Sequence, residues 1–245
     1  MTDDRLVAIH QPNFFPWLGY FDKIARADVF VLMDNVQFPR TGGGNWLNRV
    51  QLMVSGRPAW ATMPVDRSRG ALRISEMKID DAGPWRQKLA RTLEMSYARA
   101  PFFRELLPQV REWLNRPTTS LAEFNEANIR AVAELLGLDT RGVVRGTELE
   151  AGGASTELLI AMTRAAGGSA YLCGSGSAKY QDDVRFEQEG LGVVHQKFVH
   201  PVYPQAGGGE FVPGLSVLDA LFNLGPEGTR ALLHPHGAAP APAAS

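Results

Sequence analysis

The sequence predicts an α/β fold of Rossmann-like type, with a mixed, mainly parallel sheet and a helical insertion. Two short apolar runs, at residues 6–9 and 29–33, flank a short helical segment at 20–26. A strand, a helix and a second strand within about 30 residues form a βαβ unit, whose two strands run parallel. A similar pattern lies near the C-terminus, with a helix at 157–166 and strands at 170–173 and 193–199. Such units favour a sheet that is covered on both faces.

The middle of the chain predicts a β-hairpin followed by helices. The hairpin strands at 50–54 and 59–63 flank turn-forming residues at 55–58, and a further strand is expected at 72–79. Apolar residues at helical spacing then predict helices, and a capping box at Ser120 to Glu123 starts the third. The expected helices span 84–97, 101–114 and 120–136.

The end of the chain predicts a strand at 140–144, a long loop at 200–214 and a last helix at 215–223. We expect one α/β domain over residues 1–236, with its helical insertion at about 84–137. The low-complexity segment at 237–245 is expected to be a disordered tail.

Composition excludes several classes of protein. The formal net charge of −1 lacks the basic excess that is typical of nucleic-acid binders. The single cysteine excludes an internal disulfide and a Cys-rich zinc site. No motif indicates a metal, no signal peptide begins the sequence, and no apolar run reaches the length of a membrane span. We therefore expect a cytoplasmic protein without a metal.

The turn after the first strand is the first candidate site. Ligands of open α/β sheets bind at the carboxyl ends of the strands, and this turn combines polar residues with aromatic residues and prolines there. His10 and Gln11 are candidate catalytic groups, while Asn13 and Tyr20 are candidate substrate-binding residues. A rigid structural turn with a capping histidine is the alternative.

Two further clusters follow the second strand and precede the hairpin. Asp34 is a candidate base, and with Gln37 it occupies the place where an acidic residue of a Rossmann-like unit binds a ribose hydroxyl, although Asp-Asn also favours a simple polar turn. Arg49 could bind a carboxylate or phosphate through two parallel hydrogen bonds, and Asn48 could position a polar substrate. An ordinary surface arginine is the alternative.

A glycine-containing segment follows the strand that ends at Cys173. Gly174, Ser175 and Tyr180 are candidate substrate-binding residues, because backbone amides after a strand can face an anion. Cys173 could be a nucleophile if a histidine lies near it. A cysteine in a strand is more often a small buried apolar residue.

The long loop and the last helix supply the remaining candidates. His200 and Tyr203 lie in a segment that could form a lid or a pocket wall, and Asp219 could face the same pocket. Ser216 and Asp219 are also spaced as an N-cap and the third residue of a helix, which is a structural role.

These segments together resemble the WbqC-like family of bacterial proteins. The matching pieces are residues 10–21 (HQPNFFPWLGYF), 34–37 (DNVQ), 46–49 (WLNR), 174–180 and 211–223 (FVPGLSVLDALFN). The resemblance implies a role in clusters for surface polysaccharides, including O-antigen, or for specialised metabolites, with glycine transfer to an amino group as one suggested activity. A weaker resemblance to nucleotidyltransferase-type Rossmann-like proteins lacks their two phosphate-binding histidines, because the matching stretch at 16–20 reads PWLGY.

The leading functional hypothesis is an acyl- or aminoacyltransferase that acts on an amine of a sugar or metabolite. His10 or Asp34 would be the base, and Gln11, Asn48 or amides near Gly174 would stabilise the oxyanion. The expected partners are an activated acyl donor, bound to a carrier or a nucleotide, and nucleic acid only as an aminoacyl donor. A nucleotide-dependent enzyme and a non-catalytic binding protein are the alternatives.

Overall fold

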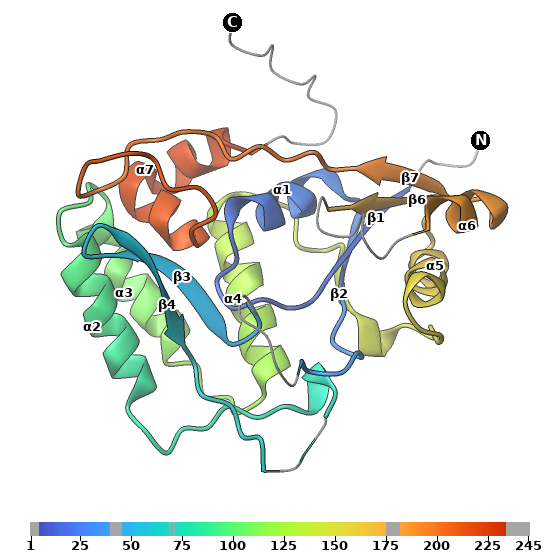
Figure 1. Ribbon diagram of the computed structural model, residues 1–245, viewed down its shortest axis with the longest axis horizontal. Helices are drawn as coiled ribbons and strands as arrows, with labels where there is room; N and C mark the ends of the chain where they lie inside the picture. Colours follow the sequence, from blue (N-terminus) through green and yellow to red (C-terminus); the bar gives the residue numbers. More distant parts are fainter. Residues whose placement is uncertain (1–4, 40–45, 69, 71, 175–181, 234–245) are drawn as a thin grey trace, which may run out of the picture.

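The parallel sheet lies at the centre of one half of the molecule (Figure 1). The computed structural model describes residues 5–39, 46–68, 70, 72–174 and 182–233. Its five strands run parallel in the order β5-β2-β1-β6-β7. They are β1 (Leu6–His10), β2 (Val29–Leu32), β5 (Val143–Arg145), β6 (Ala170–Cys173) and β7 (Gly192–His195). This arrangement confirms the Rossmann-like α/β prediction.

Alternate side chains of each strand enter two separate cores, because successive residues of a strand point to opposite faces. Val7 and Ile9 pack with helices α5 (Thr156–Ala165) and α6 (Asp183–Gln188). Ala8, between them, packs in the core on the opposite face. That face is covered by α1 (Leu18–Arg26), α4 (Leu121–Leu135) and α7 (Val217–Ala231). The short apolar strands are therefore buried on both sides, as their sequences predict.

The hairpin and two more helices extend the second core away from the sheet (Figure 1). The hairpin strands are β3 (Arg49–Val54) and β4 (Arg57–Thr62), and the helices are α2 (Trp85–Tyr97) and α3 (Phe103–Leu114). The hairpin prediction is confirmed, although the turn is shorter than expected. Ser55 and Gly56 alone form it, with φ angles of 51° and 75°, which are the left-handed angles that a tight two-residue hairpin turn requires. Among the described residues, no helix combines the length and the apolar character that a membrane span requires.

Three expected elements differ in the structure. Residues 72–79 contain the 3-10 helix η1 (Ile74–Glu76) instead of a strand, and only isolated bridges, such as Val65 with Ile79, pair this segment. The strand expected at 193–199 ends at His195. The last helix resumes beyond a kink at Gly225, whose φ of 69° no right-handed helix adopts.

The chain order places a topological switch point next to the first strand. Starting from β1, strands β2 and β5 are added on one side of it, and strands β6 and β7 are added later on its other side. The direction therefore switches between β1 and β6, and ligands of open α/β sheets bind outside the carboxyl ends of strands at such a point. His10 ends β1 and Cys173 ends β6.

Candidate functional site

Two side chains from distant parts of the sequence hold the turn after β1. Asn125 of α4 donates hydrogen bonds to the carbonyl oxygens of Pro12, at 2.8 Å, and Leu47, at 2.7 Å. The hydroxyl of Ser216 donates to the carbonyl oxygen of Phe15 at 2.7 Å. Phe15 has a φ of 41°, a backbone strain that a bulky residue adopts only where its surroundings impose it. The turn is thus a fixed frame at the end of β1.

His10 is a neutral imidazole at this position. Its Nδ1 lies 3.2 Å from the carbonyl oxygen of Gln11, which assigns the proton to Nδ1 and leaves Nε2 as an acceptor. Its ring lies edge-on to Trp17 and Tyr20, with centroid distances of 5.5 and 4.9 Å. Burial, and to a smaller extent the nearby charge of Lys23, together lower the pKa of His10 to about 3. His10 is therefore a hydrogen-bond acceptor at neutral pH and a weak base.

His10 should make folding stability sensitive to acid. Its folded-state pKa of about 3 lies below the ordinary 6.5, so between these values the unfolded chain binds more protons. The stability contributed by neutral His10 is complete above pH 6.5 and is lost as the pH falls towards 3. The slope approaches about 1.4 kcal/mol per pH unit. Urea unfolding of wild type and His10→Phe across this range should show wild type losing stability relative to the variant as the pH falls, whereas parallel curves would contradict the assignment.

Lys23 is a functional candidate that the sequence reasoning missed. It lies on α1 with 4% of its surface exposed, within a helix segment whose residues from Leu18 to Ile24 are all buried. Burial lowers its pKa to about 8, while the neighbouring Cys173 acts in the opposite direction. Its Nζ lies 3.2 Å from the point where a Cβ on Gly174 would be. A lysine inside an apolar helical stretch was the signal that could have identified it.

Cys173, His195 and Asp183 form a hydrogen-bonded series at the ends of β6 and β7. The Sγ of Cys173 lies 3.1 Å from Nδ1 of His195, and Nε2 of His195 lies 3.0 Å from Oδ2 of Asp183. We call this series the relay. Parallel pairing sets Cys173 directly opposite His195 in the sheet. The thiol is fully buried, whereas the side chains of His195 and Asp183 are 42% and 44% exposed.

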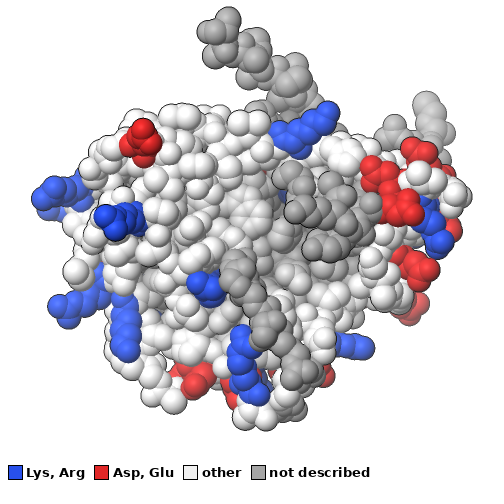
Figure 2. Space-filling view, viewed as in Figure 1, with Lys and Arg blue, Asp and Glu red and all other residues white. Residues whose placement is uncertain are grey.

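The chemistry of the relay follows from its geometry. A thiol that donates to one imidazole nitrogen, with the other nitrogen donating to a carboxylate, is the arrangement that activates a nucleophilic sulfur. The buried Lys23 interacts electrostatically with Cys173. The outer end lies where acidic side chains gather over α5 and α6 (Figure 2). An anionic substrate is therefore disfavoured at that end.

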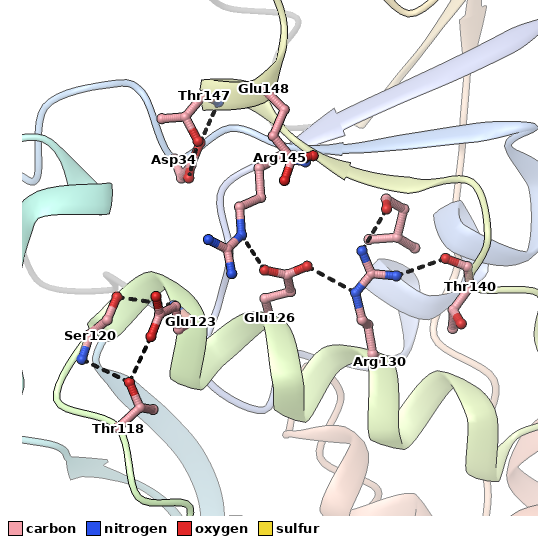
Figure 3. Close-up of polar contacts among 11 residues, drawn as sticks. Asp34, Thr118, Ser120, Glu123, Glu126, Arg130, Thr140, Arg145, Thr147 and Glu148 are labelled. Atoms are coloured by element: carbon pink, nitrogen blue, oxygen red, sulfur yellow. Dashed lines mark hydrogen bonds and ion pairs between the residues drawn. The ribbon is translucent and has the colours of Figure 1, made fainter.

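Asp34 lies in a different environment, at the end of β2 (Figure 3). Its two carboxylate oxygens accept hydrogen bonds from the backbone N–H of Thr147, at 2.8 Å, and from its hydroxyl, at 2.9 Å. Nearby, Glu126 is shared by Arg130, at 2.9 Å, and Arg145. Asp34 thus joins β2 to the 3-10 helix η2 (Gly146–Glu148), and its role as a base stays a prediction.

The other polar candidates near the turn are dispersed. Asn13 and Tyr20 are buried, and the Tyr20 hydroxyl donates to the carbonyl oxygen of Gln11 at 3.0 Å. Among the described residues, the side-chain amide of Gln11 has no hydrogen-bond partner. Gln37 is exposed and pairs through its backbone with Arg73.

The hairpin candidates have structural contacts of their own. The side-chain amide of Asn48 donates to the carbonyl oxygen of Met63 at 2.8 Å. Arg49 lies over the ring of Trp60, with the guanidinium carbon 4.7 Å from the ring centroid. The hydrogen bond of Asn48 therefore ties the start of the hairpin to Met63, which follows the second hairpin strand. Arg49 keeps its guanidinium partly exposed.

The loop candidates lie around α7. Tyr203 and Tyr97 both donate to the carboxylate of Asp219, and His200 lies near the backbone N–H of Gly214 at 3.4 Å. Burial lowers the pKa of His200. Ser216 is the N-cap of α7, as expected from the sequence, and accepts from the backbone N–H of Leu218. Gly174 faces Lys23, as described above, while Ser175 and Tyr180 lie outside the described residues.

Within the described ranges, no group of three or more His, Cys, Asp or Glu side chains could hold a metal ion. The structure thus brings together His10, Gln11, Tyr20 and Gly174 from the candidates named by sequence, and adds Lys23 and His195. Asp34 and Asp219 make their hydrogen bonds with other elements. Asp34 accepts from η2. Asp219 accepts from α2 and from the loop after β7.

Comparison with known proteins places the chain among relatives of undetermined activity. The model of the WbqC-like protein family matches residues 11–231. An uncharacterised protein of Mycobacterium tuberculosis, Rv1507c, is 32% identical over 226 residues, which cover 91% of this chain and 95% of that protein. No solved structure matches the chain. These matches support the family and leave the reaction to be inferred from the site.

Proposed function

The chain belongs to the WbqC-like protein family, and from this premise we propose that it is an acyl- or aminoacyltransferase that forms an amide through a thioester on Cys173. The observation that carries the proposal is the relay, with its sulfur-to-nitrogen distance of 3.1 Å and nitrogen-to-oxygen distance of 3.0 Å. A thiol, an imidazole and a carboxylate in series suit the transfer of an acyl group in two steps.

In the first step the sulfur of Cys173 attacks the carbonyl carbon of an activated ester or thioester donor. His195 takes the thiol proton at Nδ1 and then delivers it to the leaving alcohol or thiol, so that a new thioester forms and the donor bond breaks. Asp183 keeps the imidazole oriented and stabilises its charged form. Because the thiol is fully buried, donor binding must open a path to the sulfur.

In the second step an amine of the acceptor attacks the thioester carbonyl. The amine loses a proton to His195, the carbon–sulfur bond breaks, and the sulfur leaves as a thiol that carries that proton. The products are an amide and the original enzyme. The free amide of Gln11 would donate to the oxyanion, and the ammonium of Lys23 would stabilise the sulfur while it is negatively charged.

The acceptor proposed here is an amine of a sugar or metabolite, and the setting is surface-polysaccharide or specialised-metabolite biosynthesis in the cytoplasm. The family resemblance supports this setting. A donor bound to a carrier or a nucleotide, or an aminoacylated nucleic acid, would supply the acyl group. The reaction itself requires no metal, because the sulfur is activated by the imidazole.

Mass spectrometry tests the proposal. Incubation with the glycyl thioester of pantetheine should add one glycyl group to the peptide that contains Cys173, and Cys173→Ala should not acquire it. Addition of glucosamine should discharge the adduct and yield the N-glycyl product. Amide formation by Cys173→Ala at the wild-type rate would exclude the thioester. If neither a glycyl thioester nor a glycyl ester gives adduct or amide, the transferase proposal is wrong.

Nucleotide binding is a second candidate function, and the switch of chain direction between β1 and β6 is the observation that favours it. A thermal-shift screen with purine and pyrimidine nucleotides would detect it. An unchanged melting temperature with every nucleotide would count against this alternative.

A further inference from the structure

Three partly exposed tryptophans and one arginine lie together where the start of α1 meets the hairpin. Trp17 and Trp46 have ring centroids 5.2 Å apart, and Trp46 and Trp60 have centroids 5.0 Å apart. Together with Arg49 they form what we call the aromatic wall. All four side chains are neither buried nor fully exposed. Tryptophan is enriched at binding interfaces because it offers a large apolar ring together with an N–H donor, so this cluster is a candidate binding surface.

Arg49 lacks the partner that its charge requires. Its Nε is buried without a hydrogen bond, and among the described residues the guanidinium forms no ion pair. An arginine stays charged at all physiological pH values, so a buried N–H of this group without an acceptor is costly. Stacking on Trp60 fixes the plane of the guanidinium and therefore the direction of its donors. This geometry suits an anion that accepts two parallel hydrogen bonds.

His10 connects the aromatic wall to the relay. Its ring contacts Trp17, and it lies close enough to Lys23 for the lysine charge to lower its pKa. Lys23 in turn interacts electrostatically with Cys173. A series of neighbouring side chains thus runs from Trp17 through His10 and Lys23 to Cys173, at the carboxyl ends of β1 and β6.

The charge distribution favours the wall as the place for an anion. Around the hairpin, on the face toward the viewer, Figure 2 shows Lys and Arg side chains but no Asp or Glu outside the grey atoms. Most acidic side chains on this face gather over α5 and α6 and along its lower edge, and one further acidic group lies at the upper left. An anionic group would therefore be attracted to the hairpin and repelled from the outer end of the relay.

We propose that the aromatic wall is the acceptor subsite and binds a phosphorylated ring, with the ring on the tryptophans and the phosphate on Arg49. The role of this subsite as the acceptor site rests on the proposed transferase function. Binding of a phosphorylated ring does not require that reaction. A sugar phosphate and a nucleotide share this chemistry. Stacking would supply affinity without demanding one ring type, and Arg49 would select for the anion.

Calorimetric titration of Cys173→Ala, which cannot form the thioester, separates this inference from the proposed function. The probes are glucosamine 6-phosphate and uridine monophosphate, with glucosamine and inorganic phosphate as the ring and the anion alone. One phosphorylated ring should bind at least about tenfold more tightly than either fragment, because it makes the stacking and the anion contacts together, and tenfold corresponds to about 1.4 kcal/mol. Tight binding of glucosamine 6-phosphate would identify the ligand as a sugar phosphate. Tight binding of uridine monophosphate would identify it as a nucleotide.

Variants locate the subsite. On the same Cys173→Ala background, Arg49→Met should weaken binding about tenfold, and Trp60→Leu should do the same through lost stacking. Arg49→Lys keeps a charge and should bind with intermediate affinity, which guards against a folding defect in the Met variant. The matched control is Arg57→Met, an exposed arginine at the other end of the same hairpin, which should bind as before. The inference fails if neither phosphorylated ring exceeds inorganic phosphate, or if folded Arg49→Met and Trp60→Leu bind as tightly as their parent.

Discussion

Replacement of His195 by alanine should lower the rate of glycyl transfer by about 10²- to 10⁴-fold, the range that a positioned general acid–base contributes. Without the imidazole, the thiol proton has no acceptor at 3.1 Å, and the leaving group has no donor. Asp183→Asn should cost less, about tenfold, because both partners are more than one-third exposed and water takes over part of the stabilisation.

Single-turnover acylation by the glycyl thioester of pantetheine is the appropriate measurement, since it isolates the step in which His195 removes the thiol proton. Glu187→Gln provides the matched control, because it removes an exposed carboxylate from the same helix as Asp183 without touching the relay. Acylation of His195→Ala should regain speed at high pH, where hydroxide deprotonates the thiol. A His195→Ala rate equal to that of wild type would remove His195 from the mechanism.

The relay also shows where sequence reasoning reaches its limit. The strand at 170–173 is predictable because its residues are apolar and glycines follow it. That Cys173 has His195 as its partner is a property of the register between two neighbouring strands, which no local pattern encodes. Asp183 lies on α6, a helix of six residues that is too short for its periodicity to be visible.

Lys23 illustrates a different limit. Helix periodicity predicts α1 correctly, but it assigns charged residues to the solvent side by default. In the structure Asp22 and Lys23 are both buried, because the chain after β7 returns across α1. Gln196 of that returning segment donates to Asp22 at 2.8 Å and to the carbonyl oxygen of Gly19 at 2.6 Å. Which charged residues are buried is thus decided by a segment more than 170 positions away.

Asp219 is a case in which the residue was identified and its surroundings were not. Its spacing from Ser216 indicated a helix cap, and its place in the family-like segment indicated a pocket. In the structure it is fully buried and accepts from Tyr97 at 3.0 Å, from Tyr203 at 2.8 Å and from Gln205 at 3.0 Å. Three donors from two distant segments therefore converge on one carboxylate.

Replacement of Asp219 by alanine should destabilise the fold by about 3 to 5 kcal/mol, the range for breaking a buried charged network. The change leaves both tyrosine hydroxyls without their acceptor, leaves the Gln205 amide with the carbonyl oxygen of Val212 alone, and removes the hydrogen bonds that join α2 and the loop after β7 to α7. Asp219→Asn should cost less, about 1 to 2 kcal/mol, since its remaining oxygen still accepts from Tyr203. Urea denaturation of the two variants measures both values.

The difference in unfolding free energy between wild type and Asp219→Asn should depend on pH. That dependence distinguishes a buried carboxylate from a side chain that is only well packed. Burial raises the pKa of Asp219, although the hydrogen bonds from Tyr203 and Tyr97 oppose the shift. Since the folded-state pKa exceeds the unfolded one, the stabilisation is complete below the ordinary value of 3.8 and is lost as the pH rises through the folded-state pKa. Asparagine does not titrate, so the stability deficit of Asp219→Asn relative to wild type should be largest in acid and shrink towards neutral pH. A deficit that grows with pH would mean that the folded protein holds Asp219 as a stabilised anion.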